Sequence, residues 1–149
     1  MAKRKNSRFC FDLPQGWEDQ TVYHFIGPEE SGLRHSVRMV IDRTLLKKEI
    51  KQFARVKTQP IADSLQSIEV LKDEETTVGG CFPSYEFVYK WVLGEKRTMI
   101  NNCVFVIADG MGFCFEARFS KKSYKTVGLQ LRDIVEAILP GTFEPQDED

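Results

Sequence analysis

Hydrophobic and polar residues alternate in three segments near the start of the chain, which is the pattern of strands with one buried face. The segments are 8–13, 21–27 and 35–43, and the turn-forming stretches "PQGWEDQ" and "GPEESGLR" separate them. This pattern predicts that the chain begins with three strands joined by turns.

A helical period replaces the alternation over residues 44–66. Apolar side chains recur there every three or four positions, and basic side chains take the opposite side. Pro60 falls inside this segment, which predicts either a kink or a second helical piece with proline in its first turn. Another helix is predicted over 121–139, where an apolar stripe precedes a terminating Pro-Gly dipeptide.

Between the two helices the pattern predicts four further strands. They are 68–72, 84–93, 97–107 and 112–119, with a polar loop "KDEETTVGG" after the first and a hairpin signal, Asp-Gly, before the last. The whole order is βββαββββα, without the strand-helix-strand repetition of a doubly wound fold. We therefore expect an α+β fold, in which a mainly antiparallel twisted sheet has both helices packed on one face.

Length and charge narrow the class of protein. The 149 residues predict a single domain, 1–149, that is large enough to bury a core, with flexible tails at the basic start, 1–7, and the acidic end, 144–149. A net charge of -1 provides no long-range attraction to nucleic acid or anionic lipid. Because no window approaches the ~20 apolar residues of a membrane span and no signal-peptide run is visible, we expect a cytoplasmic protein that does not insert into membranes.

Strong catalytic and metal-binding motifs are absent from the sequence. No Walker loop, dinucleotide fingerprint, HExxH, GxSxG or paired CxxC occurs, so we expect a protein that is not an enzyme and has no metal or cofactor. The cysteines are interpreted as free thiols in a reducing compartment, and their spacing from the histidines does not indicate zinc: Cys10, Cys81, Cys103, Cys114, His24 and His35. A Cys-His nucleophile pair is the enzymatic alternative, because such partners meet in space.

Apolar residues occupy both alternating positions on several predicted strands. The segment "TVYHFI", residues 21–26, shows this, and strands 84–93 and 97–107 repeat it. Two helices about 10 Å across cover one face of a seven-stranded sheet, which is roughly 30 Å wide, but not both faces. One apolar face is therefore expected to be an interaction surface. The alternatives are that the strands curl beneath their own loops, or that a homodimer hides this face.

Three segments carry a resemblance to a known family. "FDLPQGWEDQTVYHF", "SVRMVIDR" and "VGGCFPSYEFVYKW", followed by a long hairpin and a C-terminal helix, resemble the Eag (effector-associated gene) chaperones of bacterial type VI secretion, which have a PsbP-like fold. The similarity covers about residues 8–140, in order and with similar spacing. It implies a cytoplasmic homodimer that binds the hydrophobic N-terminal transmembrane segments of a secreted effector, shields them from water and helps load the effector onto the secretion spike.

The resemblance also implies which strand residues contact this client. In the family, the strand after the "GW-D" turn offers alternate apolar side chains. Here that position places Val22, His24 and Ile26 toward the client and Tyr23 and Phe25 toward the protein's own helices. His24 departs from the pattern, because an aliphatic residue would be the simpler choice there.

Three further client-binding residues follow from the same alignment. Val40 lies in "MVIDR", with Arg38 on the same parity, and Gln59 and Asn102 lie near positions where the family uses side-chain amides that bond to client helices. An amide both donates and accepts hydrogen bonds, so it suits polar groups on a helix surface. The alternative for both amides is an ordinary surface side chain bonded to water.

A rival hypothesis from another functional class is an accessory or scaffold domain. Such a PsbP-like domain would bind a folded protein partner through its loops, and its own dimer would bury the apolar sheet face. A dimer interface that consumes this face favours the rival, whereas a free face favours the chaperone.

Overall fold

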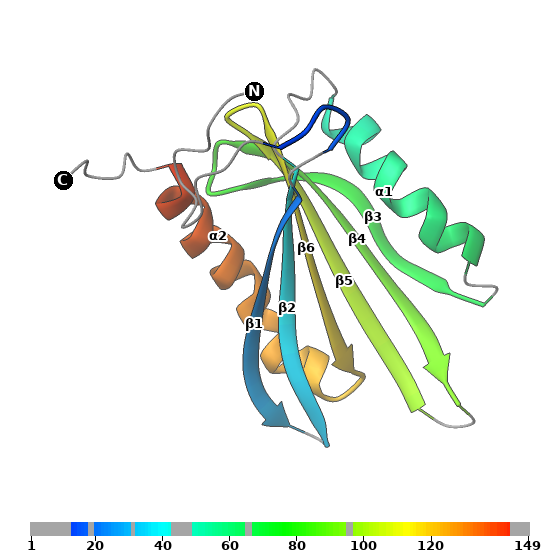
Figure 1. Cartoon of the computed structure of the whole chain (residues 1–149). Coiled ribbons are helices and arrows are strands. Elements are labelled where there is room, and N and C mark those ends of the chain that lie inside the picture. Colours follow the sequence, from blue (N-terminus) through cyan, green and yellow to red (C-terminus); the bar gives the residue numbers. More distant parts are fainter. Residues whose placement is uncertain are drawn as a thin grey trace.

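The computed structural model describes residues 13–17, 20–30, 32–42, 49–64, 67–94 and 97–143, with side chains to residue 137. Six antiparallel strands form one sheet in the order β1-β2-β6-β5-β4-β3 (Figure 1). The strands are β1 (Gln20–Glu30), β2 (Leu33–Asp42), β3 (Glu69–Val78), β4 (Phe82–Leu93), β5 (Arg97–Ala108) and β6 (Met111–Ser120). The helices are α1 (Ile50–Ser64) and α2 (Gln130–Phe143).

The predicted class, α+β with a mainly antiparallel sheet, is confirmed, and so is most of the element order. The first predicted strand, 8–13, lies outside the described residues except for Leu13, as do both predicted tails. The Asp-Gly hairpin signal is also confirmed. Asp109 and Gly110 join β5 to β6 with φ of 51° and 73°, the left-handed values that a two-residue type I′ turn requires.

The predicted polar loop after residue 72 was wrong, because β3 continues through this run to Val78. β3 is an edge strand, so polar side chains along it stay in water. Two ion pairs also join it to β4: Lys72 Nζ lies 2.7 Å from Glu86 Oε1, and Lys90 Nζ lies 2.8 Å from Glu69 Oε2. Charge that is typical of a loop is therefore compatible with a strand at this edge.

The predicted helices also differ in detail from the observed ones. α1 runs continuously through Pro60, so no second helical piece begins there. The segment after β6 starts with two short 3-10 turns, Ser123–Lys125 and Val127–Leu129, before α2 begins at Gln130.

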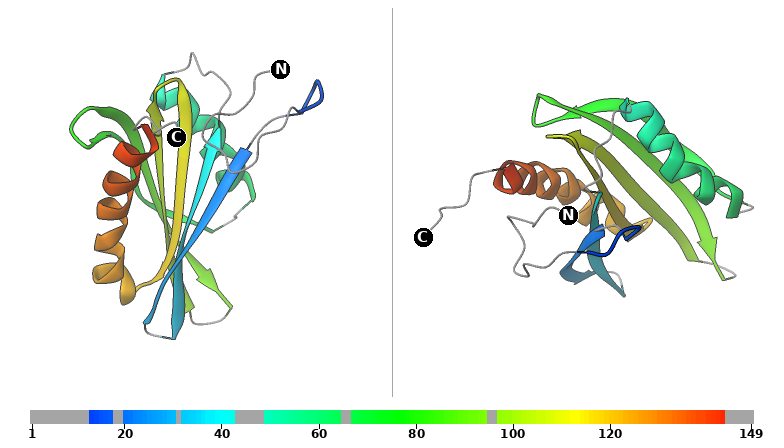
Figure 2. Two further views of the ribbon diagram at one scale, coloured as in Figure 1. Left: turned by 60° about the vertical axis from the view of Figure 1, so that its left-hand side comes forward. Right: turned by 45° about the horizontal axis from the view of Figure 1, so that its top comes forward.

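The prediction that both helices pack on one face was wrong: they pack on opposite faces (Figure 2). α1 packs through Phe53 and Ala54 on a cluster that includes Tyr85, Phe87 and Phe105. On the other face, Leu131 and Val135 of α2 pack in a cluster with strand residues of the opposite parity: Val104 and Val106 of β5, and Phe113 and Phe115 of β6. Central strands that are apolar on both parities need cover on both sides, and one helix supplies it on each.

One helix cannot cover a whole face of six strands. α1 packs mainly over β4 and β5, which leaves the same side of β6, β2 and β1 without a described helix above it (Figure 1). We call this α1 side of β1, β2 and β6 the open face. β1 forms the outer edge of this face. Its pairing with β2 shifts register between Ile26 and Glu29.

Candidate functional site

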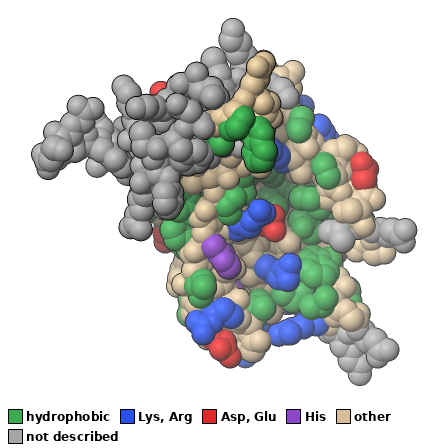
Figure 3. All heavy atoms as spheres, viewed as in Figure 1, with side chains coloured by type: hydrophobic (Ala, Val, Ile, Leu, Met, Phe, Trp, Pro, Cys, Tyr) green, Lys and Arg blue, Asp and Glu red, His purple; other side chains and the backbone are tan. Residues whose placement is uncertain are grey.

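The strand register places the residues of the open face in two rows. Val22 pairs with Val40, and Val40 pairs with Cys114. In the next row Arg38 lies between His24 and Glu116. Because side chains alternate along a strand, both rows point to the α1 side, and Figure 3 shows apolar and charged side chains mixed over this side of the molecule.

The apolar side chains near the edge of this face are largely in water. Val22 is 47% exposed and Ile26 is 67% exposed, while Val40, one strand further in, is half-buried. Each large apolar side chain left in water forgoes a share of the roughly 1.5–3 kcal/mol that full burial contributes. The row of Val40 and Val22 therefore continues the buried apolar surface under α1 outward to the sheet edge.

A groove deepens the open face where it meets α1. The hollow has a volume of about 240 Å³ and lies between the helix and strands β2, β5 and β6. Its lining includes Val40, Ile61, Phe105 and Cys114, with Lys57 and Arg38 as cations and Glu116 as the carboxylate. The groove thus has an apolar floor and a rim whose charge is positive by one.

A hydrogen-bonded aromatic network lies beside this groove. Trp91 Nε1 donates to Asn101 Oδ1 at 2.8 Å, and Asn101 Nδ2 donates to the Tyr89 hydroxyl at 2.9 Å. Arg118 stacks over the Trp91 ring, 5.4 Å from its centroid. Burial raises the pKa of Tyr89 to about 12, so its hydroxyl stays protonated at neutral pH. Both ends of the Asn101 amide have partners, which holds this part of the face rigid.

The two thiols that line the groove, Cys103 and Cys114, are protonated at neutral pH. Burial raises the pKa of Cys114 to about 12 and moves that of Cys103 further upward, whereas Cys81 is exposed on the loop before β4. No group of three or more His, Cys, Asp or Glu residues suited to a metal ion occurs within the part of the chain that the structure describes.

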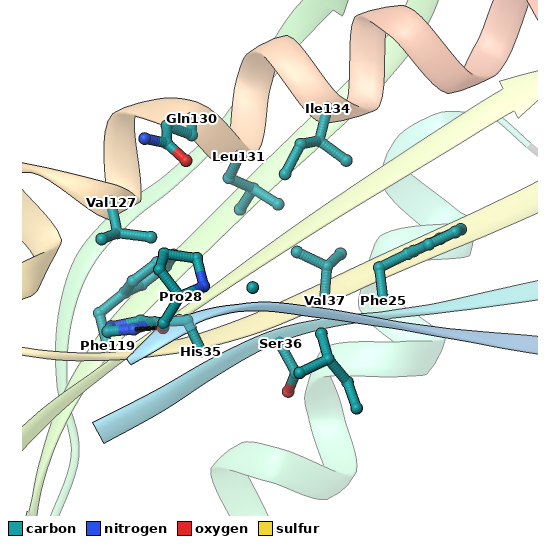
Figure 4. Close-up of a pocket in the computed structure, with 12 residues that line it drawn as sticks. Phe25, Pro28, His35, Ser36, Val37, Phe119, Val127, Gln130, Leu131 and Ile134 are labelled. Atoms are coloured by element: carbon teal, nitrogen blue, oxygen red, sulfur yellow. Dashed lines mark hydrogen bonds between the residues drawn. The ribbon is translucent and has the colours of Figure 1, made fainter. Parts of the chain in front are cut away.

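The two histidines occupy opposite environments. His24 is exposed on the open face, while His35 is buried on the α2 side, where Nδ1 donates to the Pro28 carbonyl at 2.9 Å and Nε2 lies 2.8 Å from Ser123 Oγ. His35 lines a hollow of about 110 Å³ beneath α2, into which Leu131 and Ile134 point (Figure 4). Its ring is bonded at both nitrogens, which suits a packing role.

The structure brings four of the six predicted client-binding residues together. Val22, His24, Ile26 and Val40 share the open face, and Tyr23 and Phe25 point to the α2 side as expected from the alternation. Both of those rings remain partly exposed, at 42% and 38%.

The two predicted amides lie elsewhere. Gln59 is exposed on α1, two residues from the groove-lining Lys57 and Ile61 and hence on the outer side of the helix, and its Nε2 donates to Asp63 Oδ1 at 3.0 Å. Asn102 is buried on the α2 side of the sheet. The amide that does face the α1 side is its neighbour Asn101.

Sequence reasoning also missed Lys57 and Ile61 in the lining of the groove, and the network of Trp91 beside it. A helical wheel places Lys57 and Ile61 on the same side as Phe53 and Ala54, so the spacing held that signal. The position of Trp91 depends on the register of β4 against β5, which no local pattern specifies.

Neither helix in the described part of the chain has the length and apolar character needed to cross a bilayer.

The solved structures that match this chain include the two that follow. Protein of Unknown Function PA94 from Pseudomonas aeruginosa matches with a TM-score of 0.71 and 13% identity over 99% of each chain, a similarity that shows the fold alone. LpqN of Mycobacterium tuberculosis, which is involved in cell envelope biogenesis, matches with a TM-score of 0.44 and 14% identity over 75% of this chain and 79% of its own. No curated protein matches.

A protein-family comparison covers nearly the same span as the described fold. The family model DcrB matches residues 9–136, which includes all six strands, α1 and the first half of α2. This match spans well over half of the chain, and the protein therefore belongs to the DcrB family.

Proposed function

We propose that this DcrB-family protein is a non-enzymatic chaperone or adaptor whose open face binds an apolar helix of a partner protein. The observation that carries the proposal is the apolar row of Val40 and Val22, which runs out from α1 to the sheet edge with no described helix above it. Ile26 adds a further exposed apolar side chain to the same face of β1. The partner would supply the missing cover.

The width of the open face suits one helix. Three strands at about 4.8 Å each span about 14 Å, and a helix with its side chains is about 10 Å across. α1 already forms a helical layer over the neighbouring strands β4 and β5. A partner helix beside α1 would extend this layer, with its apolar stripe on Val22 and Val40 and its flank against Ile61.

The charges on the groove favour a partner with acidic flanks. Arg38 and Lys57 line it against the single carboxylate of Glu116. Complementary charge at a binding rim contributes more to orientation and association rate than to affinity. An apolar helix flanked by Asp or Glu would therefore dock in a preferred direction.

The resemblance to Eag chaperones supports a specific partner. It is an N-terminal transmembrane segment of a type VI secretion effector, which the protein would bind in the cytoplasm as a homodimer and hold out of water until the effector is loaded onto the spike. The mechanism is mass action, because binding makes the shielded complex the most stable state of the apolar segment.

Co-expression with the N-terminal fragment of such an effector tests this function. We expect the wild-type protein to keep the fragment in the soluble fraction, and the double substitution Val22→Gln with Val40→Gln to lose most of this effect while keeping its thermal transition. Val92→Gln is the matched control, since Val92 is 59% exposed and lies, by alternation, on the other side of the sheet. A fragment that is equally soluble without the protein contradicts the proposal.

The rival scaffold role gives a different result with the same variants. If the protein's own dimer buries the open face, Val22→Gln with Val40→Gln will convert the dimer to a monomer in sedimentation equilibrium, and Val92→Gln will not. If the double variant stays dimeric but no longer keeps the effector fragment in the soluble fraction, the result supports the chaperone role.

A further inference from the structure

Basic side chains concentrate at one end of the sheet. Because the strands are antiparallel, the β1–β2 turn, the β4–β5 turn and the segment that follows β6 all lie at this end, which is the lower end in Figure 1. The described cations of these segments and of the strand ends beside them number six: Arg34, Arg97, Arg118, Lys121, Lys122 and Lys125. The described carboxylates there are two, Glu29 and Glu30, so the local charge is +4, although the whole chain carries -1. We call these three segments the basic end.

Hydrogen bonds join these segments into one surface. Arg97 Nη2 donates to the Gly32 carbonyl at 3.4 Å, which connects the start of β5 with the β1–β2 turn, although β2 and β5 are not neighbours in the sheet. Thr126 Oγ1 donates to Glu30 Oε1 at 2.8 Å, so the segment after β6 lies against the end of β1. Figure 3 shows Lys and Arg side chains beside apolar ones at the lower end of the molecule. The six cations therefore belong to one surface.

The protein itself does not neutralise the charge of this surface. All six cations are exposed, and none forms an ion pair with another residue of the described chain. Arg34 and Arg97 donate to backbone carbonyl groups, which are uncharged. Lys90, near the same end, is paired with Glu69 at 2.8 Å and adds no net charge. Uncompensated cations on one surface attract an anionic partner, and the whole-chain charge of -1 hides this attraction.

An exposed apolar side chain lies among these cations. Leu93 ends β4, is 45% exposed and pairs across the hairpin with Arg97. Surfaces that lie on anionic bilayers combine these two features, because cations bind the lipid headgroups while apolar side chains enter the boundary of the acyl chains. A surface for single-stranded nucleic acid would instead offer free aromatic faces for base stacking. Arg118 already stacks over the nearby Trp91 ring, 5.4 Å from its centroid, so the composition favours lipid.

We propose that the basic end binds the surface of a membrane that contains anionic lipids, with Arg97, Lys121 and Lys122 on the headgroups and Leu93 at the acyl boundary. The site is distinct from the open face, because the basic end terminates the sheet, whereas the groove lies on its flat face beside α1. This membrane contact adds to the proposed chaperone role and does not depend on it.

Sedimentation with lipid vesicles tests the proposal. We expect the full chain to sediment with vesicles made of equal parts phosphatidylcholine and phosphatidylglycerol. It should bind vesicles of phosphatidylcholine alone at least about tenfold more weakly, because only the first kind carries negative charge. Added salt should release the protein, since salt screens charges on an exposed surface. Equal binding to both vesicle types, no binding to the anionic vesicles, or binding to a double-stranded DNA fragment alone overturns the proposal.

Charge-reversed variants test which surface is responsible. Lys121→Glu with Lys122→Glu removes the local charge of +4 and should abolish sedimentation with the anionic vesicles. Lys51→Glu with Arg55→Glu is the matched control, because it changes the net charge equally at exposed positions of α1, outside the basic end, and should keep the binding. Since all four side chains are exposed, both variants should keep the wild-type thermal transition. Equal losses in the two variants, or full binding by the first, contradict the proposal.

A single substitution separates the apolar contribution from the charge. Leu93→Ser keeps every cation, so it should weaken binding to the anionic vesicles several-fold and leave its salt dependence unchanged. Unchanged affinity of this variant contradicts a contact of Leu93 with the acyl boundary. If the double substitution at residues 121 and 122 fails to fold, Lys125→Glu provides a milder charge reversal, and full binding by that variant overturns the proposal.

Discussion

Two neighbouring asparagines on β5 show how differently the two faces of the sheet are built. Asn101 faces α1, beside a groove, and its amide is bonded at both ends to Trp91 and Tyr89. Asn102 faces α2, is equally buried, and has an oxygen with no partner. The asparagine beside the groove thus has its hydrogen bonds satisfied, whereas the asparagine on the more apolar face has an oxygen without a partner.

The two faces also differ in apolar content, and the α2 face is the more apolar. The α2 face holds the larger cluster, with Phe113, Phe115 and Phe119 fully buried across β6. On the α1 face the same strand presents Cys114, Glu116 and Arg118, two of them exposed charges. We therefore expect the α2 face to contribute more to folding stability than the α1 face.

We expect the largest loss of stability when a core side chain on the α2 face is truncated. Phe115→Ala removes a fully buried ring and leaves a cavity, so we expect a loss of about 3–5 kcal/mol in the free energy of unfolding measured with urea. Ile26→Ala, on the open face, is the control and should cost far less. Comparable losses for the two variants would mean that the open face is part of the core.

Substitutions of the two asparagines should differ by a smaller amount in their effect on the free energy of unfolding. Asn101→Leu leaves the Trp91 N–H and the Tyr89 hydroxyl without partners, so we expect a loss of about 1–3 kcal/mol. Asn102→Leu removes an oxygen that has no bond, and its stability should stay equal or rise. Thermal unfolding of both variants checks this contrast, and a larger loss for Asn102→Leu would show that its amide is bonded in solution.

Alkaline pH should lower stability in part through Cys114, one of the two thiols that line the groove. Burial raises the pKa of Cys114 from 9.0 to about 12, so above pH 9 the unfolded chain loses this proton before the folded chain does. Its contribution is present below pH 9 and declines between pH 9 and 12, by up to about 1.4 kcal/mol per pH unit. Cys114→Val should flatten the fall in stability measured by urea unfolding over this range. An unchanged slope would show that the thiol is not desolvated.

The smallest effects should come from the open face itself. Val22 is half exposed, so Val22→Gln should change the free energy of unfolding by no more than about 0.5 kcal/mol, as surface substitutions do. Denaturant unfolding measures this change, and the same variant should weaken partner binding. A marked destabilisation would place Val22 in the core and remove the reason for proposing a free face.

The local sequence pattern predicted the strands well, but not the face of the sheet on which each helix packs. The alternation in residues 21–26 placed Val22 and Ile26 on one side and Tyr23 on the other, and the register confirms it. The helices could not be placed in this way, because central strands that are apolar on both parities support a helix on either face. The charged residues of β3 resembled a loop because the pattern does not show that a strand lies at a sheet edge.

The amides of the candidate site depended on a single-residue offset. Asn101 and Asn102 are adjacent, and only the pairing of β5 with β4 and β6 decides which of them faces α1. A slip of one residue exchanges the two faces of a strand, so composition alone could not separate the residue beside the groove from the residue on the α2 side.

The register shift in β1 has a consequence for self-association. A strand at a sheet edge that is apolar on both sides is a template for adding strands from other copies, which leads to aggregation. In the described sheet, β1 shifts register between Ile26 and Glu29, and this stretch includes Pro28, which has no N–H to donate. The irregular edge therefore discourages strand addition and the aggregation that it leads to.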